Sequence, residues 1–261
     1  MKTSDTFDFR RFGLLVRQNF IHHNRMMVLC VVGFCGGLFL LLLLVQAINK
    51  FETWTRDAYS NTFYTIFILT GLLYAGTAFT GLRSKEKSFS YLLTPASAFE
   101  KFLLEFLVRI VLFLILVPLL YWAVFNTEGF FVQAIRENFE FKPYSYTEFT
   151  LFPVLTSELR QWLIAMCIAL GLLILTLPFA GAATFMRYPL PKTLFGVTAI
   201  FLFHVLIVYF FLEILKFNGP SHGKVLGMDG EDFIKFLTVY GIIANIVVLA
   251  ASYFKLKERE V

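Results

Sequence analysis

The chain has 261 residues, of which 58% are hydrophobic and only 16% are charged, and its mean hydropathy is +0.71. A soluble domain of this length does not need so much apolar surface, so we predict an all-α polytopic membrane protein forming one transmembrane domain. The formal charge of +5 does not indicate nucleic-acid binding, because the basic residues flank apolar runs and form no separate basic domain.

The N-terminal segment 7–25 predicts an amphipathic helix that lies in the membrane interface. At helical spacing one face is aromatic, and basic residues lie away from it. These residues are Phe9, Phe12 and Phe20, and Arg10 and Arg17. Such a helix places its aromatic face at the lipid boundary and its arginines near the headgroups. A short juxtamembrane helix with no role beyond anchoring fits the same pattern.

Six uncharged runs follow, each about as long as a membrane-spanning helix. They cover residues 26–49, 61–82, 110–127, 161–186, 193–212 and 236–254, and the third span, 102–127, is expected to begin earlier than its uncharged run, near Phe102. If the N-terminus is cytoplasmic, the segments on the inner side hold 15 of the 23 Lys and Arg residues. The positive-inside rule therefore predicts six spans with both termini in the cytoplasm. In the first turns of the third span, Arg109 is expected to pair with Glu105 one turn back.

The outer segments differ in length. Segment 128–160 is long and rich in Phe and Tyr. This composition predicts ordered structure at the outer leaflet instead of a disordered linker, and favours a structural lid over a role in gating or substrate contact. Segment 213–235 holds the acidic residues Asp229, Glu231 and Asp232, which we expect to cap the last helix.

The cytoplasmic segment 83–101 contains more than a basic loop. An apolar cluster is followed by Thr94-Pro95, and Pro95 disfavours a helical Thr94. Ser97 and Glu100 have the spacing of a capping box, which predicts a new helix leading into the third span. The residues of interest are Lys87, Phe89, Tyr91, Leu92, Leu93, Pro95, Glu100 and Lys101. An ordinary basic loop followed by a helix cap fits the same residues.

Small and ionisable residues within the spans suggest further features. Gly33 and Gly37 have GxxxG spacing, with Gly36 beside them, which predicts a close helix–helix contact either within one subunit or between two. Pro118 and Pro178 are expected to kink the third and fourth spans. His204 is the ionisable residue that lies deep in a span, and it is expected to be a neutral, satisfied histidine, with a functional role as the alternative.

The motifs of several enzyme classes are missing. The sequence contains no GxxxxGK[ST], HExxH, GxSxG or CxxC pattern. The three cysteines fall inside apolar runs, and His22-His23 has no Cys or carboxylate at ligand spacing, so no metal site is predicted. We therefore expect a chain that is not an enzyme and holds no cofactor of its own.

The basic amphipathic N-terminal segment, the six spans with both ends inside, and the loop LLTPASAFEKFL together resemble the permease subunit of an ABC-2 type ABC transporter. The resemblance covers the topology of the whole chain, whereas the local motif covers about twenty residues. It implies that 83–101 carries a coupling helix that docks on a separate cytoplasmic ATPase, where ATP and Mg bind. It also implies a second permease copy, with an interface along the first and fifth spans.

Two features depart from the family pattern. Segment 213–235 leaves limited room for re-entrant outer helices, and the long outer segment 128–160 is unusual. The resulting hypothesis is a permease in the bacterial inner membrane that exports a lipid-like or hydrophobic substrate. The alternatives are a non-transporting scaffold or force-transmitting subunit of a larger complex, and a membrane-embedded enzyme.

Overall fold

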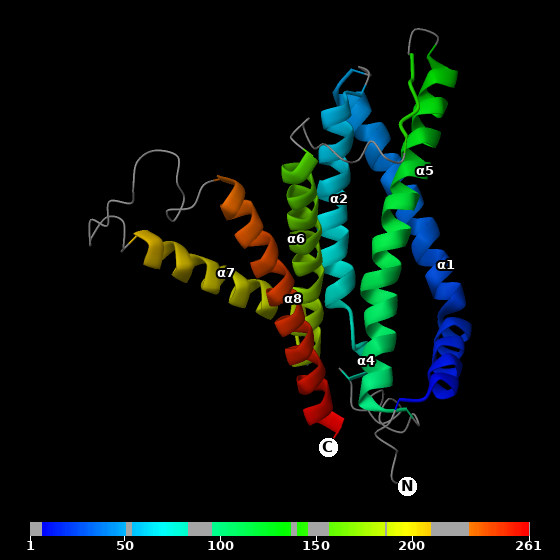
Figure 1. The fold of residues 1–261 in the computed structure, drawn as a ribbon. Helices are drawn as coiled ribbons and strands as arrows, with labels where there is room; N and C mark the ends of the chain where they lie inside the picture. Colours follow the sequence, from blue (N-terminus) through cyan, green and yellow to red (C-terminus); the bar gives the residue numbers. More distant parts are fainter. Residues whose placement is uncertain are drawn as a thin grey trace. The chain divides into compact units, whose positions relative to one another are not determined.

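The computed structural model describes residues 7–50, 54–82, 96–136, 140–145, 157–185, 187–209 and 230–260. All regular secondary structure among these residues is helical, which confirms the all-α fold class (Figure 1). Four of the described helical stretches are long and apolar enough to cross a membrane. They are Asn24–Ile48, Ala98–Ile135, Gln161–Thr184 and Glu231–Arg259. These lengths and compositions indicate a membrane protein.

Helices also cover the second and fifth predicted spans. These are α2 (Arg56–Gly76) and α7 (Pro189–Tyr209), and neither is among the four candidate spans. Six spans, and the side of the membrane on which each terminus lies, therefore stay predictions. His204 belongs to α7, but its side chain lies outside what the structure describes.

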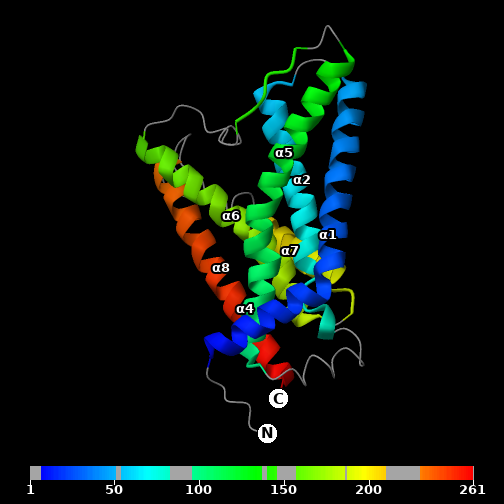
Figure 2. The same ribbon diagram turned by 90° about the vertical axis from the view of Figure 1, so that its right-hand side faces the viewer.

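The predicted interfacial helix and the first predicted span form one helix, α1 (Phe9–Ile48), of 40 residues. It begins at Phe9 because Asp8 is extended, with φ −128° and ψ 118°, and its carboxylate accepts a hydrogen bond from the Arg10 backbone N–H. Figure 2 shows that α1 bends, so that its first turns run across the direction of its apolar remainder. The predicted boundary at residues 25–26 thus falls inside one continuous helix and is not a break.

The third predicted span is the middle of a longer helix. It consists of α4 (Ala98–Phe106), a π-helical stretch η2 (Leu107–Val111) and α5 (Leu112–Ile135). The helix continues past residue 127, where the span was predicted to end and the outer loop to start, so only the position at which the chain leaves the membrane stays a prediction. That boundary followed from the cost of placing the Glu128 charge in lipid, but Glu128 is buried inside the protein and does not interrupt the helix.

The remaining helices are α6 (Ser157–Thr184) and α8 (Gly230–Glu260). The first starts within the predicted outer loop 128–160, which is therefore shorter than expected at both ends. Pro189 occupies the first position of α7, where its missing N–H costs no hydrogen bond. Glu231 and Asp232 lie in the first turn of α8, as expected for acidic residues near a helix N-terminus. The predicted third member of that cluster, Asp229, lies outside the described residues.

The helices form two compact units. Unit 1 consists of Met1–Thr70 and Leu103–Leu151, and unit 2 of Gly71–Phe102 and Phe152–Val261. In unit 1, α2 lies beside α5 (Figures 1 and 2), and the Tyr121 hydroxyl donates a hydrogen bond to the Tyr59 carbonyl oxygen at 2.9 Å. The buried core of this unit is rich in aromatic rings. It contains Leu38, Leu42, Tyr59, Phe63, Ile66, Tyr121, Val124 and Phe125.

The described stretch 140–145 belongs to the predicted aromatic outer segment, and it makes specific contacts with its neighbours. The Tyr144 backbone N–H donates to Asn126 Oδ1 at 3.0 Å, and its ring stacks on Tyr59 with centroids 4.6 Å apart. The Tyr144 hydroxyl donates to the Trp54 carbonyl oxygen at 2.5 Å. This stretch therefore packs onto unit 1 through aromatic and hydrogen-bond contacts.

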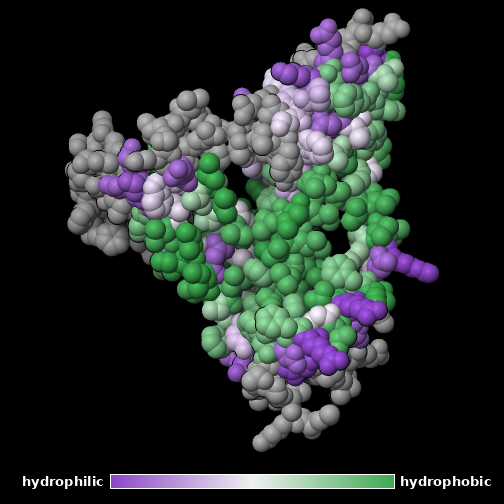
Figure 3. Space-filling model, turned by 45° about the vertical axis from the view of Figure 1, so that its right-hand side comes forward, coloured by the Kyte–Doolittle hydropathy of each residue, from purple (hydrophilic) through white to green (hydrophobic). Residues whose placement is uncertain are grey.

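In unit 2, α6 packs against α7 and α8. Asn245 of α8 is buried and joins two helices, because its Nδ2 donates to the Ala169 carbonyl oxygen at 2.9 Å and its Oδ1 accepts from Thr176 Oγ1 at 2.8 Å. Large apolar side chains remain exposed elsewhere, including Leu29, Phe195 and Val247. Figure 3 shows hydrophobic residues spread broadly over the visible face, as expected for surfaces in contact with lipid.

Candidate functional site

The structure describes only the end of the predicted coupling segment. Six of its predicted residues lie outside the described part of the chain: Lys87, Phe89, Tyr91, Leu92, Leu93 and Pro95. The next described residue is Ala96, which lies two residues before the start of α4. Ser97, Glu100 and Lys101 can therefore be placed, and they define how the third membrane helix begins.

The capping box at this helix start is confirmed. The Ser97 backbone N–H donates to Glu100 Oε2 at 2.9 Å, and the Glu100 backbone N–H donates to Ser97 Oγ at 3.2 Å. Each side chain thus satisfies a backbone donor that has no partner within the helix. Glu100 is fully buried and Lys101 is nearly so. The Glu100 carboxylate therefore holds the helix start together instead of presenting a charge at the surface.

Aromatic rings surround the same helix start within unit 2. The Phe102 ring lies 5.6 Å from Phe179 of α6 and 5.7 Å from Tyr253 of α8, measured between centroids. Phe99 also contacts Tyr253, at 5.8 Å in an edge-on arrangement. The first turn of α4 is therefore packed against both long helices of this unit.

About one turn later, the helix changes from α-helical to π-helical geometry. The predicted pair of Glu105 and Arg109 is confirmed, with Nε of Arg109 3.4 Å from Oε2 of Glu105. Arg109 lies within the π-helical stretch Leu107–Val111, which the sequence did not indicate. Single π-helical turns inside α-helices frequently mark functional positions. The capped start and this turn lie at one end of the helix Ala98–Ile135.

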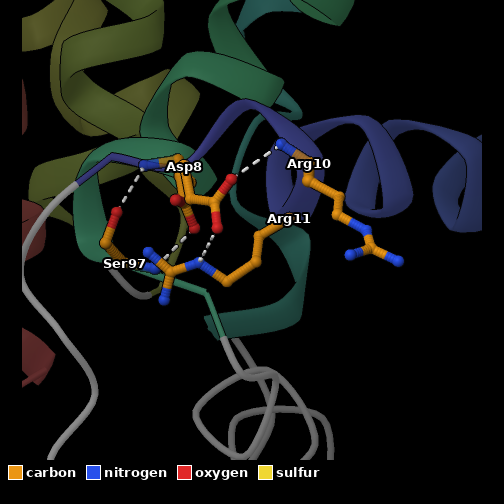
Figure 4. Close-up of polar contacts among 5 residues, drawn as sticks. Asp8, Arg10, Arg11 and Ser97 are labelled. Atoms are coloured by element: carbon orange, nitrogen blue, oxygen red, sulfur yellow. Dashed lines mark hydrogen bonds and ion pairs between the residues drawn. The ribbon is translucent and has the colours of Figure 1, made fainter.

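The N-terminal part of α1 has the exposure expected of an interfacial helix. Phe9 is 83% exposed and Phe20 is 42% exposed, while Arg10 and Arg17 are also exposed. Figure 4 shows the start of this helix, where the Asp8 carboxylate accepts from the Arg10 backbone N–H at 2.8 Å. Nε of Arg11 lies 3.8 Å from the same carboxylate, so Asp8 both caps the helix and pairs with its first turn.

The glycine face of α1 is open. A Cβ atom added to Gly33, Gly36 or Gly37 would have no neighbouring atom within 4 Å. The described residues therefore do not form the close contact within one chain that the GxxxG spacing allows. A contact between two copies stays a prediction.

Nothing in the described ranges resembles a metal centre, since no group of three or more His, Cys, Asp or Glu side chains gathers there. The buried polar side chains of unit 1 that were not predicted from the sequence include Gln46, Ser60 and Glu128. A signal existed for Glu128, because it follows Tyr121 and Phe125 at seven and three residues and therefore shares their buried face. Gln46 gave the same kind of signal, because it follows Leu38 and Leu42 at eight and four residues and therefore shares their buried face.

The capping box makes a measurable contribution to stability. We expect Ser97→Ala and Glu100→Ala each to lower the free energy of unfolding by about 0.5–2 kcal/mol, because each leaves a backbone N–H at the helix start without its partner. The measurement is reversible unfolding of the purified chain in a membrane mimetic. Glu100→Gln is the matched control, since Gln also closes a capping box. Equal stability of Glu100→Ala and wild type would contradict the assignment.

A comparison of this chain with models of known protein families, with curated proteins and with solved structures found no match in any of the three.

Proposed function

We propose that this chain is a six-span permease subunit of an ABC transporter in the bacterial inner membrane, with both termini in the cytoplasm. It pairs with a second copy or a related permease, and a separate cytoplasmic ATPase supplies ATP hydrolysis with Mg. The observation that carries the proposal is the capped start of the helix Ala98–Ile135, placed directly after the basic, apolar segment 83–95.

The length of the helix Ala98–Ile135 suits the transmission of force across the membrane. Its 38 residues extend about 57 Å at about 1.5 Å per residue, which exceeds a hydrocarbon core of about 30 Å. The reciprocal Ser97–Glu100 hydrogen bonds prevent its first turn from fraying. A force applied to segment 83–95 by an ATPase would therefore move the helix as a unit, instead of unwinding its end.

The surroundings of the helix start support the same mechanism. Phe99 and Phe102 contact Tyr253, which lies in the last helix of the chain. A displacement of the first turn of α4 would thus also act on α8. The proposed cycle begins with ATP-driven closure of the ATPase pair, continues with movement of 83–101, and ends with a change of access between the permease subunits.

The proposed substrate is lipid-like or otherwise hydrophobic, and it is exported. In support, the longest uncharged runs are rich in Phe and Leu, and the helices expose many large apolar side chains. The candidate spans carry few ionised side chains that could select an ion.

The test begins with a search of the neighbouring genes for a stand-alone ATPase with Walker motifs, whose absence would favour the alternatives, and continues with co-expression of that ATPase and this chain. Phe89, Leu92 and Leu93 are replaced together by Asp, and the expected result is loss of ATPase co-purification and of stimulated ATP hydrolysis. The control is Ile135→Asp, the same chemical change at an exposed position at the far end of the helix, which should leave both readouts unchanged. Retained binding and turnover in the triple variant would refute the coupling role.

A further inference from the structure

Glu128 is a buried carboxyl group that the proposed function does not use. It lies in α5, and its relative exposure is 0%. Both of its oxygens, Oε1 and Oε2, are buried without a hydrogen-bond partner. None of the ion pairs recorded among the described residues includes it. Buried carboxylates ordinarily have a charged or hydrogen-bonding partner, so this group needs a physical explanation.

Two donors in this part of unit 1 are committed to other acceptors. The Tyr121 hydroxyl donates to the Tyr59 carbonyl oxygen at 2.9 Å, and Trp54 Nε1 donates to Gln46 Oε1 at 2.9 Å. Two further buried donors, Gln46 Nε2 and the Tyr59 hydroxyl, make no hydrogen bond to the Glu128 carboxyl. The described residues thus supply no hydrogen bond to stabilise a negative charge at this position.

No basic side chain of the described residues forms an ion pair with it either. Tyr121 lies close enough to Glu128 for the two groups to interact electrostatically. The other titratable side chains in or against this core are Cys35, Tyr59 and Tyr144. All of these are neutral at neutral pH. Three basic residues of unit 1 lie on or next to the segments that form this core, and all three are exposed: Lys50, Arg136 and Lys142.

An aromatic side chain covers the helix beside this carboxyl group. The Phe141 ring lies so close to Gly129 that a Cβ atom there would overlap it, and its centroid is 5.3 Å from that of Phe130. Phe141 belongs to the extended stretch 140–145, which Tyr144 attaches to Asn126 of α5. This stretch has no helical hydrogen bonds of its own, so it can separate from α5 without unwinding the helix.

We propose that Glu128 is a proton-binding site, whose carboxyl group is held in the neutral, protonated form beside Phe141 and exchanges its proton with water when 140–145 moves away. An ionised carboxylate here would lose its hydration without gaining any partner, whereas the neutral acid buries no net charge. The inference rests on unit 1 alone and does not depend on the permease function.

Infrared difference spectroscopy of the full chain in lipid nanodiscs tests the protonation state. The spectrum of wild type minus Glu128→Gln at neutral pH should show one carboxylic-acid C=O band that the variant lacks. A difference made of carboxylate bands would overturn the proposal. So would a Glu128→Gln chain that does not fold, because Gln has the shape and neutrality of a protonated Glu.

Glu105→Gln is the matched control, because Glu105 lies on the same continuous helix but pairs with Arg109. Its difference spectrum should show carboxylate bands only, which establishes that the method separates the two states. The same acid band in this control would remove the evidence for Glu128.

The role of the aromatic cover is tested by transfer into D₂O. The acid band of wild type should shift slowly as its proton exchanges, and Phe141→Ala should speed this exchange on the order of tenfold or more, because truncation weakens the packing of 140–145 against α5. An unchanged exchange rate in a folded Phe141→Ala chain would refute the proposal that Phe141 shields the Glu128 carboxyl group from water.

Discussion

Replacing Gly181 with alanine should lower the free energy of unfolding by about 1–3 kcal/mol, the usual cost of forcing an extra carbon into a packed contact. Gly181 of α6 faces Thr193 of α7, and an added Cβ would come within 2.7 Å of Thr193 Cβ and 2.8 Å of its Cγ2. The Thr193 hydroxyl cannot turn away without cost, because it donates to the Pro189 carbonyl oxygen at 2.6 Å. We therefore expect the two helices to separate.

Gly171→Ala is the control for this change, because it lies in the same helix and an added Cβ would meet no atom within 4 Å. It should leave stability unchanged or raise it slightly, since alanine favours the helix. Both variants are compared with wild type by reversible unfolding in a membrane mimetic. If both change the free energy of unfolding equally, the close contact of Gly181 and Thr193 does not exist in the protein.

The second large effect is expected at Asn245. Its replacement by alanine should cost about 1–2 kcal/mol, because it removes the hydrogen bonds to the Ala169 carbonyl and the Thr176 hydroxyl and leaves a small cavity between α6 and α8. The expected result is a lower midpoint of unfolding with helix content retained in the folded state. An unchanged midpoint would show that these hydrogen bonds do not hold the two helices together.

A double-mutant cycle of Thr176→Ala and Asn245→Ala isolates the bond between the two side chains. We expect a coupling of about 0.6 kcal/mol, typical of hydrogen bonds between helices in membranes. Thr184→Ala in place of Thr176→Ala is the control, because Thr184 Oγ1 is exposed and donates to the Ala180 carbonyl in its own helix. Coupling of the same size in both cycles would argue against a specific bond.

The successful predictions concern contacts between residues close in sequence. The Ser97–Glu100 capping box and the Glu105–Arg109 pair both formed as expected, because residues three or four apart in a helix are neighbours whatever surrounds the helix. The same holds for the acidic first turn of α8. Of the candidate site, the sequence thus predicted the helix start, but not its burial or its aromatic contacts.

Predictions of helix ends were less accurate where a charged residue was taken as the boundary of a span. The third span was predicted to stop before Glu128, although the helix continues to Ile135. A charge marks the end of a membrane helix only where its side chain would face lipid. A side chain that faces another helix does not meet lipid, so its charge or polarity does not end the helix.

The sequence by itself determined that this protein is helical and membrane-embedded, and where the helix capped by Ser97 begins, since hydropathy and capping residues act within a few positions of each other. Only the tertiary structure decided which faces are covered: that Glu128 and Gln46 are buried, that Gly181 contacts Thr193, and that Gly33, Gly36 and Gly37 contact nothing within the described chain. The physical reason is that lipid and protein interior are both apolar, so the same hydrophobic residues suit either environment.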